Sequence, residues 1–398
     1  MLDIPAVQQA LADFHFDGWL LYDFRGSNVL AQRILKIDPA RHATRRFAYF
    51  VPRTGAPRKL VHRIEPGTLG HLPGETITYL RWEEFEAGIA SLVAGAGRVA
   101  MEYSARNAIP YVSRVDAGTV ELVRAAGAEV VCSGDLVQLF EATWDDEQWA
   151  MHREAEKHTV AAYGLVWKFI ADSVRGGRSI RETDVQRLIM DHFARNGLVT
   201  DHAPIVGVGP HSGDPHYSPE PGKDSEICAG DFVLVDLWAK LNRPRGVYSD
   251  LTRVGFVGDT VPEPYERVFQ IVRQARDAAI RCVETAYRDG RRLHGWEVDQ
   301  AARNLIEQSG YGAAFVHRTG HSIGQETHGN GANMDNLETH EERLVLPRTC
   351  FSVEPGIYLP EFGVRSEVNV FVDGTGQVHV TGGPVQDRVV AILKEYHT

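Results

Sequence analysis

The residues best suited to chemistry are four acids placed in pairs within apolar segments of the second half of this 398-residue chain. They are Asp236 in DFVLVDLWAKL, Asp250 in GVYSDLTRVGFV, Glu354 in CFSVEPGIYL and Glu367 in GVRSEVNVFV. Burying a carboxylate without a partner is costly, and the nearby Arg253 and Arg365 are too few to neutralise four of them. Two divalent cations would match this charge. Each acid taken alone would more simply be a turn or salt-bridge residue; the joint pattern favours a metal site.

A histidine-containing segment, HRTGHSIGQETHGNG, lies between the two acid pairs. Its glycines disfavour a helix and predict extended chain or loop near the acids. His321 and His328 favour one metal ligand and one polar catalytic group. Oxygen ligands with an imidazole and no thiolate suit Mn²⁺, Co²⁺, Fe²⁺ or Zn²⁺ and argue against copper. Two such ions about 3.5–4 Å apart, bridged by hydroxide, form a hydrolytic centre.

The elements that would hold these residues form a repeated series. Alternation in DFVLVDLWAKL places Asp236 and Trp238 on one face of a strand that is apolar on both sides, which indicates an interior strand. A long helix at about 147–175 and a second helix precede the Asp236 and Asp250 strands. A helix at about 263–288 and another after Gly295 precede strands that carry Glu354 and Glu367. The matching acids lie 118 and 117 residues apart, so we expect a domain with pseudo-twofold symmetry.

Residues 1–143 alternate short strands with helical segments, which predicts a separate α/β domain. This region has no GxGxxG after a strand and no GxxxxGK[ST], so a nucleotide pocket has no support. Acidic residues at 145–147 suit the amino end of the first long helix. The predicted domains are therefore 1–143 and 144–398, within an overall α/β (α+β) class.

Composition excludes several other classes of protein. A net charge of −11 argues against a nucleic-acid binder, and no run approaches the ~18 apolar residues of a membrane span. The four cysteines lie at least 54 residues apart without a CxxC pair, which is typical of a reducing compartment. The amino-terminal segment does not have the pattern of a signal peptide, so we expect a cytoplasmic protein.

The strings VDLWAK, SDLTRVG, HRTGHSIG, SVEPGIY and VRSEVNV resemble the ligand motifs of the pita-bread dinuclear metallopeptidases, over about residues 150–398. That family includes methionine aminopeptidase, aminopeptidase P and prolidase. The amino-terminal half, with YDFRGSN, resembles the creatinase-type domain that aminopeptidase P and prolidase carry. The resemblance is therefore to the X-Pro branch of the family.

The resemblance implies a role for each ligand. Asp236 would chelate one metal, and Asp250 and Glu367 would bridge both. His321 and Glu354 would complete the second. Glu354 would also accept a proton from the metal-bound water, which becomes the bridging hydroxide, and carry that proton to the leaving nitrogen.

Three further residues receive substrate-side roles from the resemblance. His216, in GDPHYSP, matches a substrate-side histidine, and His328 matches the one that hydrogen-bonds the scissile carbonyl. Arg365 matches an arginine near the proline carboxylate or the ligand shell. The alternatives are that His216 only stabilises a turn and that Arg365 only pairs with a ligand carboxylate.

The chain departs from the family pattern at two places. Asp236 and Asp250 are fourteen residues apart, further than in relatives of this kind, and the extra residues carry Lys240, Arg243 and Arg245. This 240–248 hairpin is either a solvated basic loop or a rim that meets a substrate carboxylate or the partner subunit's site. Gly329 follows His328, where relatives often have glutamate.

Together these features predict a metallopeptidase that hydrolyses Xaa-Pro dipeptides, a prolidase. Proline has no amide N–H, so peptidases that rely on that donor handle this bond poorly, whereas a metal site needs only the carbonyl and the free amine. The alternative is aminopeptidase P, acting on longer Xaa-Pro peptides. More remote alternatives are a metal-free creatinase-like enzyme or a non-catalytic binding protein. The resemblance implies a homodimer and two divalent ions, with Mn²⁺ preferred over Co²⁺, Zn²⁺ or Fe²⁺.

Overall fold

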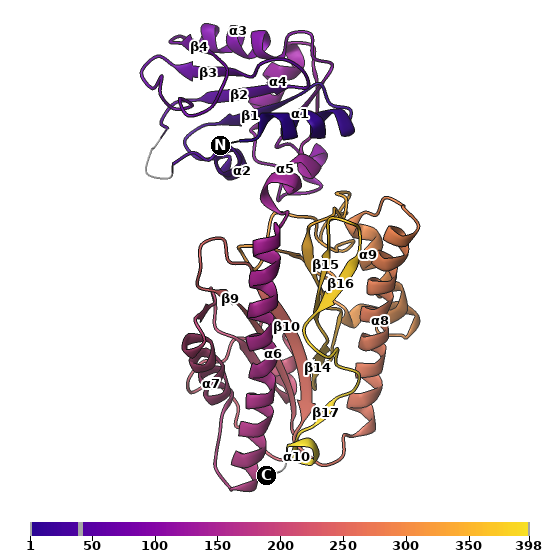
Figure 1. Ribbon diagram of the computed structural model, residues 1–398. Helices are drawn as coiled ribbons and strands as arrows, with labels where there is room; N and C mark the ends of the chain where they lie inside the picture. The colour runs from indigo at the N-terminus through magenta and orange to yellow at the C-terminus, as the bar shows by residue number, and fades with distance from the viewer. Residues whose placement is uncertain (1, 39–42, 397–398) are drawn as a thin grey trace. The chain divides into compact units, whose positions relative to one another are not determined.

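The computed structural model describes residues 2–38 and 43–396. The chain divides into two compact units, Met1–Glu141 and Ala142–Thr398. Both combine sheets with helices (Figure 1), so the predicted α/β class is confirmed. Each unit is described separately below.

The first unit is built on one six-stranded mixed sheet in the order β4-β3-β2-β1-β5-β6. Strand β2 runs antiparallel to β1 and to β3, whereas β1–β5, β5–β6 and β3–β4 are parallel pairs. The strands are β1 (Gly18–Asp23), β2 (Phe47–Pro52), β3 (Arg58–His62), β4 (Glu75–Tyr79), β5 (Arg98–Met101) and β6 (Glu129–Cys132). The helices are α1 (Ile4–Asp13), α2 (Val29–Ile34), α3 (Trp82–Val93), α4 (Ala117–Ala125) and α5 (Gly134–Glu141), with a 3₁₀ turn η1 (Ala105–Asn107).

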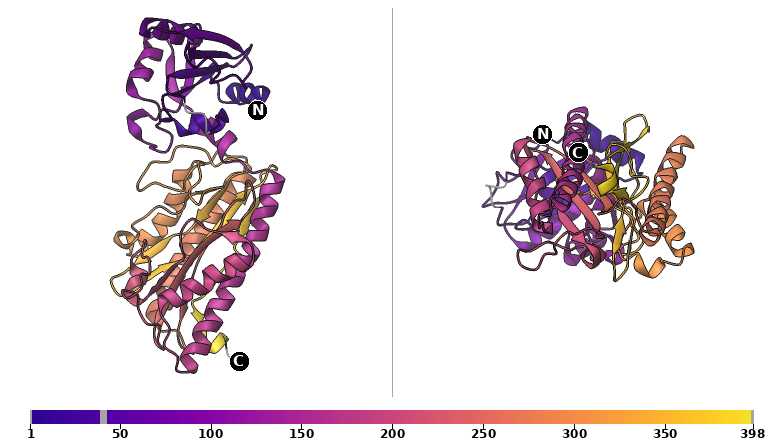
Figure 2. Two further views of the ribbon diagram at one scale, coloured as in Figure 1. Left: turned by 90° about the vertical axis from the view of Figure 1, so that its left-hand side faces the viewer. Right: turned by 90° about the horizontal axis from the view of Figure 1, so that it is seen from below.

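Strand β1 shows how this sheet is covered on both faces (Figures 1 and 2). Trp19 and Leu21 pack with residues of α1, α2 and α5, whereas Leu20 and Tyr22 pack with residues of α3 and α4. Every residue of β1 is buried. An interior strand of this kind needs apolar side chains in both alternating sets, which the sequence GWLLYD supplies.

The first half of the second unit packs two helices on a sheet that contains the two aspartates. Helix α6 (Asp146–Arg175) begins at Asp145, whose side chain accepts from the Gln148 N–H in a reciprocal capping box. Helix α7 (Glu182–Arg195) follows. The sheet runs β17-β10-β9-β7, with β8 also paired to β9. Its strands are β7 (Leu198–Val199), β8 (Ile205–Val208), β9 (Phe232–Leu241), β10 (Ser249–Phe256) and β17 (Val390–Ala391), and a 3₁₀ turn η2 spans Gly209–Gly213.

The second half repeats this arrangement with helices α8 (Glu263–Arg288) and α9 (Gly295–Gln308). Its four-stranded sheet runs β11-β12-β15-β16, and β13 and β14 form a separate hairpin. The strands are β11 (Ser322–Ile323), β12 (Cys350–Val353), β13 (Gly356–Tyr358), β14 (Gly363–Arg365), β15 (Val368–Val372) and β16 (Val378–Thr381). The 3₁₀ turn η3 (Gly312–Ala314) and helix α10 (Ile392–Glu395) complete the unit. All four long helical segments of this unit lie where the sequence predicts them.

The two faces of β9 separate the two helix layers, as its alternation predicts. Val233, Val235 and Leu237 pack with residues of α6 and α7, whereas Phe232 and Leu234 pack with residues of α8 and α9. In Figure 1, α6 and α8 accordingly lie on opposite sides of the strands of this unit. The acids of β9 and β10 therefore sit between the two halves of the unit.

One prediction about the acids is wrong: Glu354 and Glu367 do not lie within strands. Glu354 falls in the break between β12 and β13, and Glu367 in the break between β14 and β15. Pro355, next to Glu354, has no N–H to donate to a ladder. At these breaks the two side chains need not follow the alternating directions of a strand, although each residue stays next to hydrogen-bonded strands.

Within residues 2–38 and 43–396, no helix combines the length and apolarity that crossing a membrane requires. Cys228, Cys282 and Cys350 are free thiols.

Candidate metal centre

Strands β9 and β10 bring the two aspartates together by their antiparallel register. Asp236 is paired with Thr252, and Asp250 with Trp238. Because cross-strand partners lie on the same face of a sheet, all four side chains share one face. Asp236 and Asp250 are both buried, as the apolar sequence around them predicts.

Asn369 on β15 connects the two sheets at Asp250. The main-chain N–H of Asp250 donates to Asn369 Oδ1 at 3.0 Å, and the Asn369 amide donates to the Asp250 carbonyl at 2.5 Å. The main-chain N–H of Glu367 donates to the Thr252 carbonyl at 3.2 Å. A side-chain amide thus replaces a ladder bond between β10 and β15 and places Glu367 beside Asp250.

The histidine-containing segment is a loop with the short strand β11, as predicted, and it lies against β12. The His321 N–H donates to Ser352 Oγ at 2.9 Å, and the Glu354 N–H donates to the Thr319 carbonyl at 2.7 Å. A Cβ on Gly320 would lie 1.9 Å from the Ser352 carbonyl oxygen. Only glycine permits this approach, which sets the positions of His321 and Glu354.

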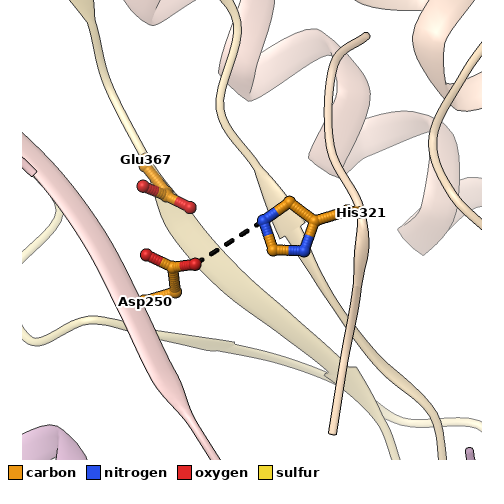
Figure 3. A group of neighbouring side chains, drawn as sticks. All are labelled: Asp250, His321 and Glu367. Carbon is orange, nitrogen blue, oxygen red and sulfur yellow. Dashed lines mark ion pairs between the residues drawn. The ribbon is translucent and has the colours of Figure 1, made fainter. Parts of the chain in front are cut away.

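Asp250, His321 and Glu367 form a group whose candidate ligand atoms all lie within 4.8 Å of one another. Figure 3 shows the two carboxylates and the imidazole pointing toward a common centre. His321 Nε2 lies 3.5 Å from Asp250 Oδ2 and 3.3 Å from Glu354 Oε1. Two buried carboxylates and an imidazole are suitable donors for a divalent transition metal.

Arg365 ties the remaining carboxylates to this group. Its guanidinium donates to Asp236 Oδ2 at 2.5 Å and lies 3.9 Å from Glu354 Oε2. The five side chains that the sequence predicts as ligands are therefore gathered in one region of the second unit.

The electrostatics of three of the four acids fit bound cations. Burial raises the pKa of Asp236 to about 7, although the guanidinium of Arg365 acts against it. Burial and neighbouring carboxylates also raise the pKa values of Asp250 and Glu367 well above their usual range. Oδ1 of Asp236 is buried without a hydrogen-bond partner. A metal ion would satisfy the Asp236 oxygen that lacks a donor and would offset the repulsion among the crowded carboxylates.

Glu354 differs from the other acids. Burial by itself would raise its pKa, but the neighbouring imidazoles of His321 and His317 and the guanidinium of Arg365 together lower the pKa of Glu354 below its usual value. The Ser352 hydroxyl donates to Glu354 Oε1 at 3.0 Å. Glu354 is therefore ionised at neutral pH and able to accept a proton.

A hydrogen-bond chain behind the acids fixes Arg365. Arg365 donates to the Tyr358 hydroxyl oxygen at 2.7 Å, and Tyr358 Oη lies 2.7 Å from His317 Nε2. His317 Nδ1 lies 2.6 Å from the Arg318 carbonyl, which can only accept, so Nδ1 carries the proton and Tyr358 donates to Nε2. Burial lowers the pKa of His317 to about 4, which keeps the imidazole neutral. This chain directs the Arg365 guanidinium toward Asp236.

His328 lies at the site, whereas His216 is not brought into contact with it. The His328 ring meets the His321 ring edge-on at 4.3 Å between centroids. The charge of His321, together with burial, lowers the pKa of His328 to about 3. His216 is exposed after η2, and among the described residues no hydrogen bond, ion pair or ring contact joins its imidazole to the ligands. Its segment is attached nearby, since Ser212 accepts from the Gly363 N–H at 2.9 Å.

In the 240–248 hairpin, two of the three cations contact other parts of the second unit. Arg245 pairs with Asp145 and also lies 3.4 Å from Glu147, so it binds the acidic amino end of α6. Lys240 donates to the Gln325 carbonyl in the histidine loop. Arg243 is exposed. The tip, residues 242–245, is exposed, so the solvated loop and the substrate-side or partner-side rim both stay predictions.

Several residues around the centre were not predicted from the sequence. Thr252, which donates to Glu367 Oε2 at 2.8 Å, could have been found because it alternates with Asp250 on β10. His317 lies four residues before His321, and Tyr358 alternates with Gly356 beyond Glu354. Asn369 lies within the string VRSEVNV, but its role depends on pairing between distant segments, which the string does not show.

Comparison with known proteins gives one family and several relatives. The sequence model of the family described as "Metallopeptidase family M24" matches residues 150–374. A Bacillus subtilis protein named "Putative dipeptidase YkvY" is 31% identical over 70% of this chain and 73% of its own length. A Pyrococcus furiosus protein named "Xaa-Pro dipeptidase" is 30% identical over 44% of this chain and 46% of its own length.

The same fold occurs in the crystal structure of dipeptidase PepE from Mycobacterium ulcerans. The TM-score is 0.65 at 22% identity, and the match covers 98% of this chain and 96% of that one. The likeness spans both units and shows the shared fold.

Proposed function

Because this chain belongs to metallopeptidase family M24, we propose that it hydrolyses the Xaa-Pro bond of dipeptides at a dinuclear metal centre. The observation that carries the proposal is the group formed by Asp250, His321 and Glu367, to which Glu354 and Asp236 are joined through His321 and Arg365. Asp236 Oδ1 is buried without a hydrogen-bond partner. A peptidase of this family needs such a cluster, and a metal-free or non-catalytic relative does not.

The residues proposed to hold the two ions are Asp236, Asp250, His321, Glu354 and Glu367. Asp236 would help to hold one ion, His321 and Glu354 would help to hold the other, and Asp250 and Glu367 would contribute to the site. When bound, the ions supply Lewis acidity that activates water and polarises the scissile carbonyl. Oxygen-rich donors with one imidazole and no thiolate fit Mn²⁺, with Co²⁺, Zn²⁺ and Fe²⁺ as alternatives.

Glu354 is proposed to move the proton. Its lowered pKa leaves the carboxylate ionised, and Ser352 orients Oε1 by donating to it at 3.0 Å. The carboxylate takes the proton of the attacking water and returns it to the proline nitrogen as that nitrogen leaves. Proline nitrogen has no hydrogen in the peptide, so it departs as an amine only after gaining a proton.

Three other residues are proposed to face the substrate. His328, beside His321, donates to the scissile carbonyl oxygen. His216 lies on the segment fastened to the β13–β14 hairpin through Ser212 and contacts the substrate once it is bound. Arg365 carries charge next to Asp236 and orients that ligand or meets the proline carboxylate.

The Xaa-Pro preference has two supports. One relative, from Pyrococcus furiosus, is named for this activity. The chemistry agrees, because a metal site recognises the carbonyl and the free amine and needs no amide N–H from the second residue.

The proposal includes a homodimer in the cytoplasm with manganese as the resident metal. Size-exclusion chromatography with light scattering tests the oligomer, and elemental analysis of protein purified without chelator tests the metal.

The deciding experiment compares three substrates after loading with Mn²⁺. We expect hydrolysis of Ala-Pro, much slower hydrolysis of Ala-Pro-Ala, and none of Ala-Ala. Faster cleavage of Ala-Pro-Ala would make the enzyme an aminopeptidase P. Absence of hydrolysis for both proline peptides, with metal bound in stoichiometric amount, would reject the proposal.

A further inference from the structure

A hydrogen-bonded group beside the centre joins three segments that lie far apart in the sequence. Trp238 Nε1 donates to Asp201 Oδ1 at 2.6 Å. The hydroxyl of Thr327 donates to the same carboxylate, at 3.2 Å from Oδ1 and 3.1 Å from Oδ2. Trp238 is on β9, Asp201 follows β7, and Thr327 directly precedes His328.

The location of Trp238 links this group to the ligands. Trp238 shares a strand face with Asp236, two residues away, and is the cross-strand partner of Asp250. The indole packs against the cluster that contains Tyr248 and Ile323. Because packing fixes the indole ring, its N–H points in one direction, and the hydrogen bond orients the Asp201 carboxylate.

The lengthened hairpin supplies the strand pairing that brings Asp201 to Trp238. Strand β9 continues to Leu241, and β7 pairs with that extension through Leu198–Leu241 and Val199–Lys240. The chain then turns, which brings Asp201 next to Trp238. Without the extension, β7 would lack this partner.

Hydrogen bonds limit the motion of the histidine loop, residues 317–331, near Thr327. Its glycines give the backbone wide freedom. Gly329 N–H donates to the Ser322 carbonyl at 2.7 Å, and Lys240 donates to the Gln325 carbonyl, so the loop is fastened on both sides of Thr327 and His328. The bond from Thr327 to Asp201 fastens the intervening residues, including His328.

We propose that Asp201 is a positioning residue that holds Thr327, and with it His328, against strand β9. Asp201 acts through the two donors and does not touch the reacting atoms. The kinetic consequence rests on the proposed function, but the structural one does not.

Hydrogen–deuterium exchange of the full-length, metal-free chain tests the structural part. In Asp201→Ala we expect the amides of residues 326–331 to exchange about tenfold faster, since a hydrogen bond to a charged group is lost. Thr327→Val and Trp238→Phe remove one donor each and should loosen the same amides. The double variant Asp201→Ala/Thr327→Val should exchange no faster than Asp201→Ala, because both changes break one interaction.

Asp373→Asn is the matched control. Asp373 also accepts from a threonine hydroxyl, that of Thr375 at 2.6 Å, and lies 2.8 Å from a ring nitrogen of His379. This variant should affect exchange at 373–377 and leave 326–331 unchanged. Wild-type protection of 326–331 in Asp201→Ala, additive effects in the double variant, or loosening of 326–331 by Asp373→Asn would each overturn the proposal.

Kinetics with Mn²⁺ and Ala-Pro test the consequence for His328. Asp201→Ala should lower kcat about tenfold at unchanged metal content, and Asp201→Asn, which keeps an acceptor for the indole N–H, should recover most of that loss. An equal loss in both variants would contradict positioning by hydrogen bonds. If wild-type protein does not cleave Ala-Pro, the proposed function fails while the exchange result still decides the role of Asp201.

Discussion

Both units bury carboxylates, but their surroundings differ. In the first unit, Glu102 is fully buried and accepts from Trp19 Nε1 at 2.7 Å, Asn28 Nδ2 at 2.7 Å and Ser133 Oγ at 3.0 Å. In the second unit, four carboxylates gather around one guanidinium, and Asp236 Oδ1 has no donor. Burial of an acid thus indicates a metal only where neutral donors do not already satisfy it.

The difference has a physical basis in donor number. A single carboxylate needs a few N–H or O–H groups, which a compact α/β unit can supply from neighbouring strands and loops. Four carboxylates at one point repel one another, and neutral donors do not remove that repulsion. Cations do.

Metal removal should produce the largest difference in behaviour between the two units. Chelation of the Mn²⁺-loaded protein should abolish peptidase activity and destabilise the second unit by about 4 kcal/mol if the metal is present at a thousandfold its Kd. The first unit should unfold as before. Scanning calorimetry with and without chelator, beside elemental analysis, checks this; superimposable traces would contradict it.

Removing one crowded acid should also have a large effect. Glu367→Gln should lower hydrolysis of Ala-Pro by more than about 100-fold, since losing even an outer contact of a metal site costs 10–100-fold. Without metal, the same variant should unfold at a higher temperature than metal-free wild type, because it relieves repulsion around Glu367. A lower unfolding temperature of the metal-free variant would argue against crowding.

Arg365→Lys should have an intermediate effect. Lysine keeps the charge but cannot bond Asp236, Tyr358 and Thr252 together as the guanidinium does. We expect kcat to fall about 10–100-fold, with weaker metal binding. Arg388→Lys is the control, because Arg388 forms ion pairs at the surface and its change should leave both quantities within error.

Glu102→Gln should have the smallest effect of these changes. In the metal-free protein it should lower the stability, whereas Glu367→Gln should raise it. A glutamine amide would direct N–H groups at existing donors, so the first unit should lose about 1–3 kcal/mol, with metal content unaffected. Thermal unfolding of the metal-free variant measures this. Stabilisation would show that Glu102 is crowded rather than satisfied.

The pH dependence of the first unit provides a second test at Glu102. Burial raises the pKa of Glu102 above its usual 4.5, so the folded unit retains a proton that the unfolded chain releases. The free energy of unfolding should therefore decrease as pH rises above about 4.5 toward the folded pKa. Glu102→Gln should abolish this slope; an unchanged slope would assign it to another group.

Much of the second unit could be predicted from the sequence. The helices at 146–175 and 263–288 lie where the pattern places them, because their apolar periodicity is long and unbroken. The apolar sequence around Asp236 and Asp250 predicted two buried strands, and β9 and β10 agree. The gathering of the five ligand candidates was anticipated from their types, their order and the resemblance.

Other features could not be predicted from the sequence. The strand assignment of Glu354 and Glu367 was wrong because apolar alternation does not report a two-residue break. The contacts of Arg245 with the start of α6 and of Lys240 with the histidine loop depend on residues 100 and 85 positions away, respectively. The substrate-side role of His216 stays a prediction.

Residue type and local order determined which side chains were available: acids within apolar strands, a glycine-rich loop with histidines, and helices long enough to cover both. Tertiary structure alone decided which acids were satisfied and which were not. Glu102 and Asp236 each stand in an apolar strand context in the sequence, yet one meets three donors and the other meets further acids. Partner groups reach a buried carboxylate through space from remote segments, and a linear pattern contains no measure of that distance.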